Sequence, residues 1–587
     1  MTKRAIEALF DPASVAVVGA TDDLGKPGGR CLAFLQQYGY RGRIYPINPK
    51  YQAIRDLACY PDLKSLPGPV EMVVLLVPAK SVPRYLREAA AAGAKAAVVC
   101  SSGFAEAGED GVRLQDDLVA AAAESGMAVL GPNSLGMLDL HHNLVASFST
   151  GLQTATMPKA GPVAFVSQSG AIGAVVYALA QADGIGFGTF LSTGNEAVLD
   201  FGHYLDYFAD DPNVALVLGY IEGIRRGRPF IAAARRAHEA GKTVAVLKVG
   251  QSEAGVKAAR SHTGALVGAA KVYEAAFRRA GVLTVGDVRT LLDLAVAIPG
   301  RYRARGRRIG IVSMSGGAGV MMADKCSAAG LDMATFSPST LAALAKVLPD
   351  FAGMSNPVDF GFVYGDPDAV EGCVNAVAQD PNVDLVLVFV GLSPNMAGIL
   401  EHRIAAAQDR SGKPIFAAWL GGPQVGINRL RELGVAAYDD PSRAVEVVAQ
   451  VARAGIPLPG CGAPESGPGG ARATATRAAL RALLAAGTTT LTEREVKSPS
   501  HQIPVTAEVL ATTAAEAEAA APGSVARSPS RPRRLSFCTS PMRAGSSWRR
   551  AGGCGGGLRC RGRGGGQGGW PGWRARRGSP AHGAIGP

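Results

Sequence analysis

Short apolar runs that alternate with alanine-rich helical stretches are the feature that most limits the folds open to this chain. Such runs recur through residues 13–140, and the pattern restarts near residues 162 and 308. A strand that reads as one continuous apolar run is covered on both faces, which is typical of parallel sheets flanked by helices. The sequence therefore predicts an α/β protein with three such domains in series and boundaries near residues 150 and 303.

The individual runs give the strands expected in each domain. They are Ser14–Val18, Arg43–Ile47, Met72–Val77, Ala96–Cys100 and Ala128–Leu130 in the first domain, Pro162–Val166, Val214–Leu218 and Thr243–Leu247 in the second, and Arg308–Val312, Leu385–Phe389 and Pro414–Ala418 in the third. Residues 456–475, beyond these strands, are rich in Pro, Gly and Ala, so a linker is expected there.

The positive charge of the chain is confined to its last segment. The net charge is +12, yet residues 523–587 contain 13 Arg, no Lys and no acidic residue, which leaves 47 basic and 48 acidic residues elsewhere. A basic protein normally suggests a nucleic-acid partner, but the body of this chain is neutral and no such partner is expected. Neither a run of about 18 apolar residues nor a signal-peptide pattern is found, which predicts a cytoplasmic protein with no membrane partner.

The cysteines of the body of the chain are scattered, and none belongs to a CxxC pair. They are Cys31, Cys59, Cys100, Cys326, Cys373 and Cys461. This spacing predicts reduced, mostly buried thiols rather than a disulfide framework or a metal site.

A glycine-rich turn joins the first predicted strand to the next helix, in the run from Val18 to Gly29. Such a turn brings backbone N–H groups and the positive end of a helix close to a phosphate, with Gly19 and Thr21 at its start. Its spacing is not GxGxxG, and Lys50 follows the second strand where an NAD ribose would require an acid. These residues disfavour an NAD oxidoreductase and favour a phosphorylated nucleotide such as coenzyme A. A tight turn without a ligand is the alternative.

Further turns of small and polar residues follow the later strands of the first domain. Pro78 comes after the third strand, Ser101 and Gly103 after the fourth, and Asn133 and Ser134 after the fifth. The carboxyl ends of parallel strands line the ligand crevice of an open sheet. We therefore expect these five residues to belong to the cofactor site, although each could be ordinary turn chemistry.

The second domain repeats this arrangement and adds a carboxylate and an imidazole. Ser169 and Gly170 stand at the start of a predicted helix, where N–H groups and the helix dipole favour a phosphate. Glu222 lies just past the strand expected to end at Leu218, where it could orient an imidazole ring or could be an ordinary acid of a surface loop. His262, in a loop of small residues, can act as a nucleophile that carries a phosphoryl group or can merely cap a helix.

Together these motifs resemble the nucleoside-diphosphate-forming acyl-CoA synthetases, the superfamily of succinyl-CoA synthetase and ADP-forming acetate–CoA ligase. The resemblance runs from about Leu9 to Leu510 and rests on SHTGA, SQSGAIG, STGNE and GPNSLG. It implies a Rossmann-like CoA-binding domain, two flavodoxin-like ligase domains and an ATP-grasp domain for ATP or ADP with Mg. It also makes His262 the phosphohistidine, Glu222 its partner, and Ser169 and Gly170 part of a phosphate site.

The resemblance divides the chain into successive segments. They are a CoA-binding domain at 1–150, a ligase domain with the phosphohistidine loop at 151–303, a second ligase domain at 304–455, a linker at 456–475, a remnant of the start of the ATP-grasp domain at 476–521, and a low-complexity Gly/Arg tail at 522–587. In the second ligase domain Met314 stands where the family usually has Asn, which weakens any role for a polar contact at that position.

The tail departs from the family and admits two interpretations. Its 17 Gly and 13 Arg in residues 523–587 could form a disordered arm that binds RNA. Alternatively, codons can be chosen for residues 537–548 that, read two bases on, encode Leu-His-Lys-Ser-Asp-Ala-Gly-Gly-Val-Val-Val, a segment typical of the family's ATP-grasp domain. The second interpretation is a frameshift near residues 498–536, with the ATP-grasp domain truncated or scrambled.

The sequence therefore predicts an acid–CoA ligase of the ADP-forming type that acts through an acyl phosphate and a phosphohistidine. It interconverts acyl-CoA, ADP and phosphate with acid, CoA and ATP, and it is expected to be incomplete without an ATP-grasp domain. Expected partners are a small-molecule acid or its acyl-CoA, an ATP-grasp subunit that supplies the nucleotide site in trans, and a second copy of the chain. The alternative function is a non-catalytic CoA-binding or regulatory protein.

Overall fold

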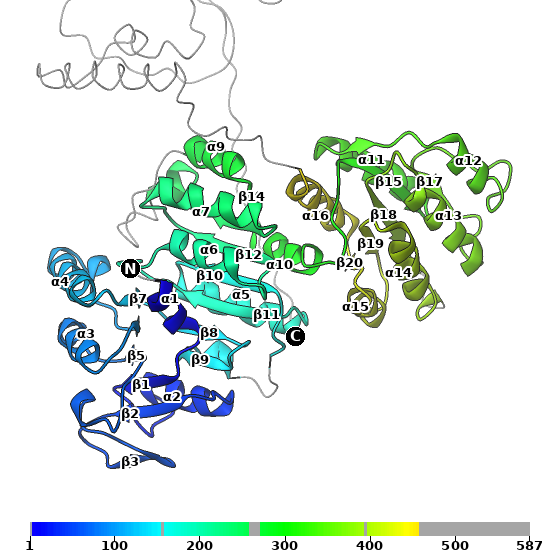
Figure 1. The fold of residues 1–587 in the computed structure, drawn as a ribbon. Coiled ribbons are helices and arrows are strands. Elements are labelled where there is room, and N and C mark those ends of the chain that lie inside the picture. The colour runs from blue at the N-terminus through cyan, green and yellow to red at the C-terminus, as the bar shows by residue number, and fades with distance from the viewer. Residues whose placement is uncertain (1–2, 154–157, 258–269, 393–395, 457–587) are drawn as a thin grey trace, which may run out of the picture. The chain divides into compact units, whose positions relative to one another are not determined.

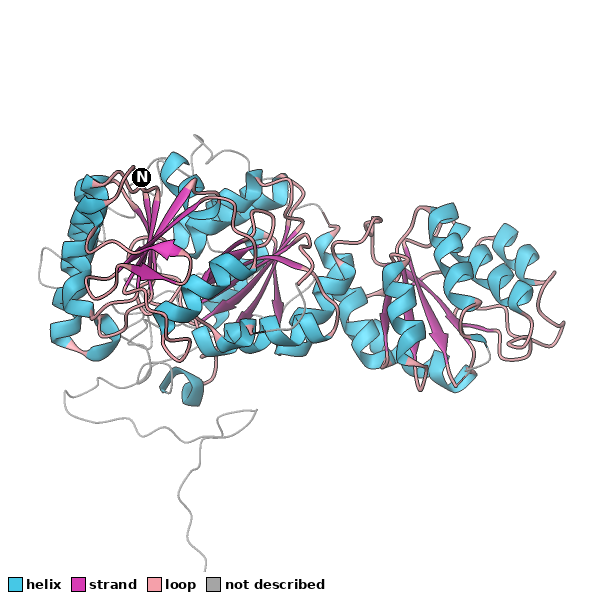
Figure 2. Cartoon of the chain, turned by 90° about the horizontal axis from the view of Figure 1, so that it is seen from below, coloured by secondary structure: helices cyan, strands magenta, loops and turns pink. Residues whose placement is uncertain are grey.

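The computed structural model describes residues 3–153, 158–257, 270–392 and 396–456. These residues belong to one compact unit, Met1–Gly460, and contain three largely parallel sheets (Figure 1). Helices lie on both faces of the strands (Figure 2). The predicted α/β class with three parallel-sheet domains is confirmed. The predicted linker, ATP-grasp remnant and tail fall within residues 456–587, of which all but Ile456 lie outside the described residues.

The first sheet has five parallel strands in the order β2-β1-β5-β6-β7. The strands are β1 (Ser14–Val18), β2 (Arg43–Ile47), β5 (Met72–Leu75), β6 (Ala96–Val99) and β7 (Ala128–Leu130), and the helices are α1 (Lys3–Phe10), α2 (Pro27–Gln37), α3 (Val82–Ala91) and α4 (Glu109–Ser125). A small hairpin of β3 (Ala53–Ile54) and β4 (Leu57–Ala58) stands apart from the sheet. The order reverses beside β1, so a crevice opens where the chain leaves β1 and β5 on opposite sides.

The second sheet has seven strands in the order β14-β13-β12-β10-β11-β8-β9. The parallel strands are β10 (Val163–Ser167), β11 (Phe187–Ser192), β12 (Leu216–Ile221), β13 (Thr243–Lys248) and β14 (Val282–Val285), accompanied by α5 (Gly170–Ala182), α6 (Phe201–Asp210), α7 (Gly227–Glu239), α9 (Ala270–Ala280) and α10 (Val288–Ala297). The hairpin of β8 (Gly136–Asp139) and β9 (Leu144–Ser147) pairs antiparallel to β11. This sheet therefore takes strands from before residue 150, and the boundary placed there stays a prediction.

The third sheet has six strands in the order β16-β15-β18-β19-β20, with β17 paired to β15. The strands are β15 (Arg308–Ser313), β16 (Asp332–Met333), β17 (Val358–Asp359), β18 (Leu385–Val390), β19 (Ile415–Trp419) and β20 (Ala436–Tyr438), and the helices are α11 (Gly316–Ala328), α12 (Pro338–Leu344), α13 (Pro367–Gln379), α14 (Leu400–Ser411), α15 (Gln424–Glu432) and α16 (Pro441–Ala454). The residues of β18 are all buried, as expected for a strand covered on both faces.

The second and third domains share one apolar core. Buried side chains of both, among them Phe165, Leu291 and Val448, belong to a single cluster. An ion pair also links the two domains. Arg443 on α16 donates hydrogen bonds of 2.6 and 3.0 Å to the carboxylate of Asp293 on α10. The hydroxyl of Tyr438 donates to the backbone oxygen of Asp293 at 2.9 Å. These contacts join the second and third domains through packing as well as through charge.

The strand β12 runs three residues further than the sequence predicted. The expected end was Leu218, but β12 pairs with β13 up to Ile221. Gly219 is tolerated there because the ring of Phe201 lies over it, so close that an added Cβ would come within 2.6 Å of a ring carbon. The missing side chain thus makes room for an aromatic ring of α6 instead of ending the strand.

The cysteines within the described residues match their expected state, since Cys31, Cys59, Cys100, Cys326 and Cys373 are free and buried. Cys461 lies outside these residues. Across the described part of the chain, no helix is both long enough and apolar enough to span a membrane.

Candidate functional site

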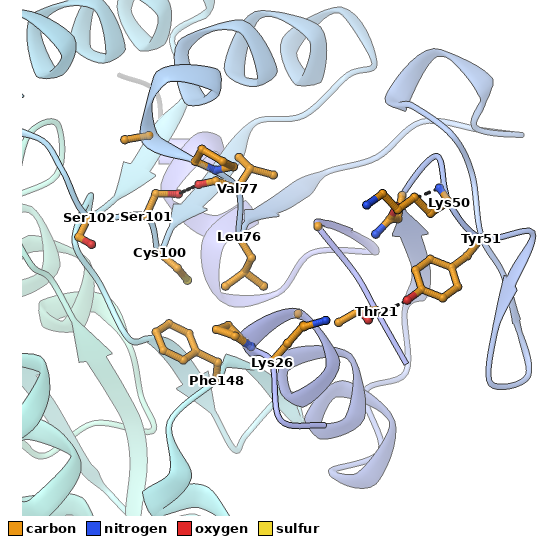
Figure 3. A pocket seen from close by; sticks show the side chains of 16 residues that line it. Thr21, Lys26, Lys50, Tyr51, Leu76, Val77, Cys100, Ser101, Ser102 and Phe148 are labelled. Atoms are coloured by element: carbon orange, nitrogen blue, oxygen red, sulfur yellow. Dashed lines mark hydrogen bonds between the residues drawn. The ribbon is translucent and has the colours of Figure 1, made fainter. Parts of the chain in front are cut away.

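A cleft of about 600 Å³ opens at the carboxyl edge of the first sheet, where the loops after β1, β2, β5 and β6 meet. Figure 3 shows the side chains around it. Five residues predicted from the sequence line this cleft, namely Gly19, Thr21, Lys50, Pro78 and Ser101. Further lining residues are Lys26, Pro27, Gly28, Asn48, Tyr51, Leu76, Val77, Ala79, Cys100, Ser102 and Phe148.

Two glycines let the backbone of this cleft fold closely on itself. Gly19 has a φ of +90°, and a Cβ added to it would lie 2.4 Å from the backbone oxygen of Leu76. A Cβ added to Gly28, near the start of α2, would lie 2.1 Å from the backbone oxygen of Gly19. A side chain at Gly19 would push the turn away from the residue that follows β5, and one at Gly28 would push α2 away from the turn. The turn therefore brings the N-terminus of α2 to the cleft, where its free N–H groups favour an anion.

Lysine and hydroxyl side chains give the cleft its charge and its polar contacts. The ammonium of Lys26, the residue before α2, lies 3.3 Å from the carboxylate of Asp23. Lys50 makes no ion pair within the described residues. The hydroxyl groups of Thr21 and Tyr51 are 3.1 Å apart, as drawn in Figure 3. Two cations beside a helix N-terminus suit the phosphates of a nucleotide. This donor set contains no acid placed to hold a ribose diol, as an NAD site would require.

Asn48 ties the loop after β2 to the glycine-rich turn. Its side-chain amide donates a 2.8 Å hydrogen bond to the backbone oxygen of Ala20, and its side-chain oxygen accepts from the N–H of Lys50 at 3.0 Å. Across the cleft, the hydroxyl of Ser101 donates to the backbone oxygen of Val77 at 2.5 Å. These bonds hold the backbone of the loops that form the cleft.

Three predicted cofactor residues are not among those that line the cleft. The N–H of Gly103 donates to the carboxylate of Glu106 at 2.6 Å, and the side-chain amide of Asn133 donates to that of Asn195 at 3.4 Å. Ser134 is only 2% exposed, and its hydroxyl donates to the backbone oxygen of Ser192 at 2.5 Å. These residues lie where the loops of the first sheet meet the end of β11. Their part in cofactor binding stays a prediction.

A second cluster of predicted residues lies at the carboxyl edge of the second sheet. Ser169 caps α5, accepting a 3.5 Å hydrogen bond from the N–H of Ile172, and Gly170 is the first residue of that helix. Glu222 follows directly after the end of β12, the neighbour of β10. Because β10 and β12 are parallel, their ends bring the start of α5 and Glu222 to the same edge. His262 lies outside the described residues.

Glu196, which the sequence analysis did not single out, is a buried acid at this edge. It is 7% exposed and accepts a 2.9 Å hydrogen bond from the hydroxyl of Thr193. Burial raises the pKa of Glu196 to about 7, and the negative charge of Asp200 adds to this effect, while the Thr193 hydroxyl opposes it. Burial also acts to raise the pKa of Asp200, but hydrogen bonds from His203 and Arg226 hold it well below its usual range.

Lys248, the last residue of β13, contacts the backbone of Glu222. Its ammonium donates to the backbone oxygen of Glu222 at 2.9 Å and lies 4.6 Å from the centre of the Tyr273 ring. Burial lowers the pKa of Lys248, an effect that the charge of Glu222 opposes. No group of three or more metal-ligating side chains occurs within the described residues.

Some residues of these sites could have been found from sequence and others could not. Lys26 stands inside the glycine-rich turn that was singled out, so its position was available as a signal. Tyr51 follows Lys50 directly. Glu196 ends the STGNE motif, but burial is the main cause of its shifted pKa, and burial of a loop acid has no sequence pattern. Lys248 directly follows the strand predicted over Thr243–Leu247, with no hint of its contact with Glu222.

Three family models match this chain in series. A CoA binding domain matches residues 13–139, a succinyl-CoA ligase like flavodoxin domain matches residues 160–298, and a ligase-CoA domain matches residues 309–449. Each match contains most of one of the three sheets described above, but β8 and β9 of the second sheet precede the second match. All residues that line the cleft except Phe148 lie within the segment that matches the CoA binding domain.

Relatives of two lengths match the same part of the chain. The alpha subunit of acetate–CoA ligase [ADP-forming] II from Pyrococcus furiosus is 37% identical over 445 residues, which are 74% of this chain and 95% of the relative. Acetate–CoA ligase [ADP-forming] I from Archaeoglobus fulgidus is 36% identical over 452 residues, 76% of this chain but only 63% of the relative. The chain thus spans nearly all of an alpha subunit and less than two thirds of the longer ligase.

A solved structure with the same fold comes from Ca. Korarchaeum cryptofilum. It is the dinucleotide forming acetyl-coenzyme A synthetase 1 in complex with phosphate and ADP, and it matches with a TM-score of 0.71 and 33% identity. The match covers 77% of this chain and 97% of that chain.

Proposed function

Because the chain belongs to the family of NDP-forming acyl-CoA synthetases, which includes the ADP-forming acetate–CoA ligases, we propose that it is the acyl-transferring part of an acid–CoA ligase. In this role it binds an acyl-CoA in the cleft of the first domain. It then passes the acyl group to phosphate and the phosphoryl group to His262. The substrate is a small organic acid or its CoA thioester.

One observation carries this proposal, namely the pairing of two anion-suited edges in consecutive domains. The cleft of the first domain places Lys26 and Lys50 beside the start of α2. The edge of the second domain places Glu222 beside the start of α5. The first edge suits the phosphates of CoA. The second edge suits inorganic phosphate, and its acid Glu222 can orient an imidazole ring.

The proposed chemistry proceeds in two balanced steps. An oxygen of inorganic phosphate attacks the thioester carbonyl, the C–S bond breaks, and the thiolate takes up a proton to give free CoA and an acyl phosphate. A ring nitrogen of His262 then attacks the phosphorus, the P–O bond to the acyl group breaks, and the acid leaves as a carboxylate. A carboxylate hydrogen-bonded to the other ring nitrogen, the role proposed for Glu222, stabilises the positive ring as it forms.

The nucleotide step is proposed to take place on another polypeptide. Phosphohistidine would pass its phosphoryl group to ADP, which gives ATP and restores the imidazole. The length match to an alpha subunit supports a partner that carries an ATP-grasp domain for ADP or ATP with Mg. We propose the acyl and CoA steps for this chain and the nucleotide step for the partner.

Isotope labelling tests the proposal. The full chain is incubated with acetyl-CoA and 32P-phosphate, and acid-labile label on the protein is measured together with free CoA. The expected result is one CoA released for each phosphoryl group bound, with no label on the His262→Ala variant. Tight CoA binding without label or CoA release would instead support the non-catalytic CoA-binding alternative.

A further inference from the structure

The side chain of Gln168 holds the backbone at Glu222 by three hydrogen bonds. Its amide oxygen accepts from the N–H of Glu222 at 2.7 Å and from the N–H of Gly223 at 3.0 Å. Its amide nitrogen donates to the backbone oxygen of Gly223 at 2.8 Å. These three hydrogen bonds form a clamp. Gln168 follows β10 and Glu222 follows β12, so the clamp joins the ends of two neighbouring strands.

The same turn is held from the other side. The ammonium of Lys248 on β13 donates to the backbone oxygen of Glu222 at 2.9 Å. The N–H of Glu222 and its backbone oxygen therefore both have partners, and these partners come from the two strands that flank β12. A backbone fixed at both polar groups restricts the directions open to its side chain.

The chemistry of these contacts selects a neutral amide. Two N–H groups face one atom of the side chain, and a carbonyl oxygen faces the other, so one end must accept and the other must donate. A carboxylate can accept at both ends but cannot donate to Gly223. It meets that carbonyl favourably only when it is protonated. Shorter or apolar side chains leave the polar groups of the turn without these partners.

We infer that Gln168 is a positioning residue for the reaction, which fixes the turn that carries Glu222. This inference rests on the proposed function, because it gives Glu222 the role of partner to the phosphoryl carrier. Gln168 does not touch the reacting atoms in this scheme. It acts through the direction that it imposes on the carboxylate of Glu222.

The charged surroundings make the clamp sensitive to the ionic form of residue 168. Glu196 lies in the loop after β11, and the Gln168 amide lowers its pKa against the larger, opposing effect of burial. Further titratable groups around the turn are Glu222 itself, Tyr220 on β12, Lys248 on β13 and Tyr273 on α9, whose hydroxyl accepts from the N–H of Ile224 at 3.0 Å. Two acids would disfavour a third negative charge at position 168, whereas the single ammonium of Lys248 would favour it.

The first experiment compares two glutamines that clamp backbone in the same way. Gln408 is 4% exposed, donates to the backbone oxygen of Gly434 at 2.9 Å and accepts from the N–H of Ile415 at 2.9 Å, all in the third domain. The variants Gln168→Ala and Gln408→Ala are made in the full chain. The single-turnover rate of labelling by 32P-phosphate with acetyl-CoA, the CoA dissociation constant and the thermal midpoint are measured for each.

Gln168→Ala is expected to slow labelling by about 10- to 100-fold while CoA affinity stays within about twofold, because misplacing a reacting group by about 1 Å has effects of this size. Gln408→Ala is expected to lower the thermal midpoint without slowing the labelling of folded protein. Equal rates for Gln168→Ala and the wild-type chain would overturn the inference. An unlabelled wild-type chain would overturn the proposed function, and the inference with it.

The variant Gln168→Glu supplies a readout that loss of packing cannot mimic. It has nearly the same shape, and its protonated form can still donate to Gly223. The ratio of its labelling rate to that of the wild-type chain should be low at pH 8 and rise several-fold as the pH falls towards 5.5. A ratio that does not change with pH would contradict a clamp that requires a donor at this atom.

Discussion

At the scale of single residues, the two edges differ in how they treat charge. The cleft of the first domain presents Lys26 and Lys50 at the surface, where they can meet the phosphates of a ligand. Glu196 and Lys248 are buried at the edge of the second domain. Burial raises the pKa of Glu196 and lowers that of Lys248, which favours the neutral form of each. Exposed cations attract a negatively charged ligand. Buried ionisable groups instead make the stability of the surrounding loops depend on pH.

Replacing Lys50 tests the cation of the cleft. Lys50→Ala is expected to weaken CoA binding by about tenfold, because it removes one charge-assisted contact to a phosphate. The measurement is a CoA titration by calorimetry at two salt concentrations, and the loss should shrink at the higher one. Lys64→Ala removes an exposed lysine that does not line the cleft and serves as the matched control. Equal losses for both variants would remove the phosphate role from Lys50.

Glu196 predicts a pH dependence of stability. Its pKa in the folded chain is about 7, against an ordinary value of 4.5, so the folded state binds a proton that the unfolded state has released between these values. The stabilisation is complete below about pH 4.5 and is lost as the pH rises through 7. The change for this one group is on the order of 1–3 kcal/mol.

The variant Glu196→Gln isolates this contribution from other titrating groups. Free energies of unfolding are measured in urea from pH 5 to pH 8 for both chains. The wild-type value should fall relative to that of the variant as the pH rises. Curves that stay parallel over this range would show that Glu196 is ionised in the folded chain at every pH measured.

At the scale of elements, the joint between α10 and α16 decides how the two ligase domains are held together. Asp293 is 3% exposed and forms a bidentate pair with Arg443, whose side chain is itself mostly covered. Apolar residues of both domains surround this pair in one cluster. Arg443 also pairs with Asp439, so the loss of Asp293 leaves the partly buried guanidinium with a single, more exposed partner.

Asp293→Ala is therefore expected to destabilise the chain by about 2 kcal/mol, because it removes two hydrogen bonds from a partly buried guanidinium and leaves the exposed Asp439 as its remaining ion-pair partner among the described residues. Urea unfolding followed by far-UV circular dichroism measures this change. The control is Asp332→Ala, which breaks the exposed pair with Arg307 and should change stability by less than about 0.5 kcal/mol. Equal effects of the two variants would mean that the buried pair adds nothing.

At the scale of the whole molecule, the cleft and all three sheets lie before residue 457. The match to an alpha subunit covers a similar length of chain. The excess of basic residues lies in residues 523–587, which follow every described helix and strand in the sequence. The proposed CoA chemistry and any contribution of the basic tail should therefore be separable.

Removing residues 457–587 tests this separation. The shortened chain is expected to bind CoA with a dissociation constant within about twofold of that of the full chain, because no lining residue is removed. Binding of the full chain to single-stranded RNA, if found, should disappear on truncation. A large loss of CoA affinity would show that residues beyond 456 contribute to the cleft.

The amino-acid sequence by itself determined the α/β class, most of the parallel strands and five residues of the cleft. These follow from local rules, because apolar runs of β-branched residues become strands and glycine-rich turns become phosphate-sized cradles. The extension of β12 past Gly219 depended on a ring from α6, and the pairing of β8 and β9 with the second sheet depended on contacts across domains.

Only the tertiary structure decided which polar residues meet. Gln168 and Glu222 are 54 positions apart, and Asp293 and Arg443 are 150 apart, yet each pair is within hydrogen-bonding distance. Burial, which raises the pKa of Glu196, is likewise a property of the packed loops and not of its neighbours in sequence. Hydrogen bonds and desolvation act through space, so local sequence patterns predict the elements but not the contacts that tune the site.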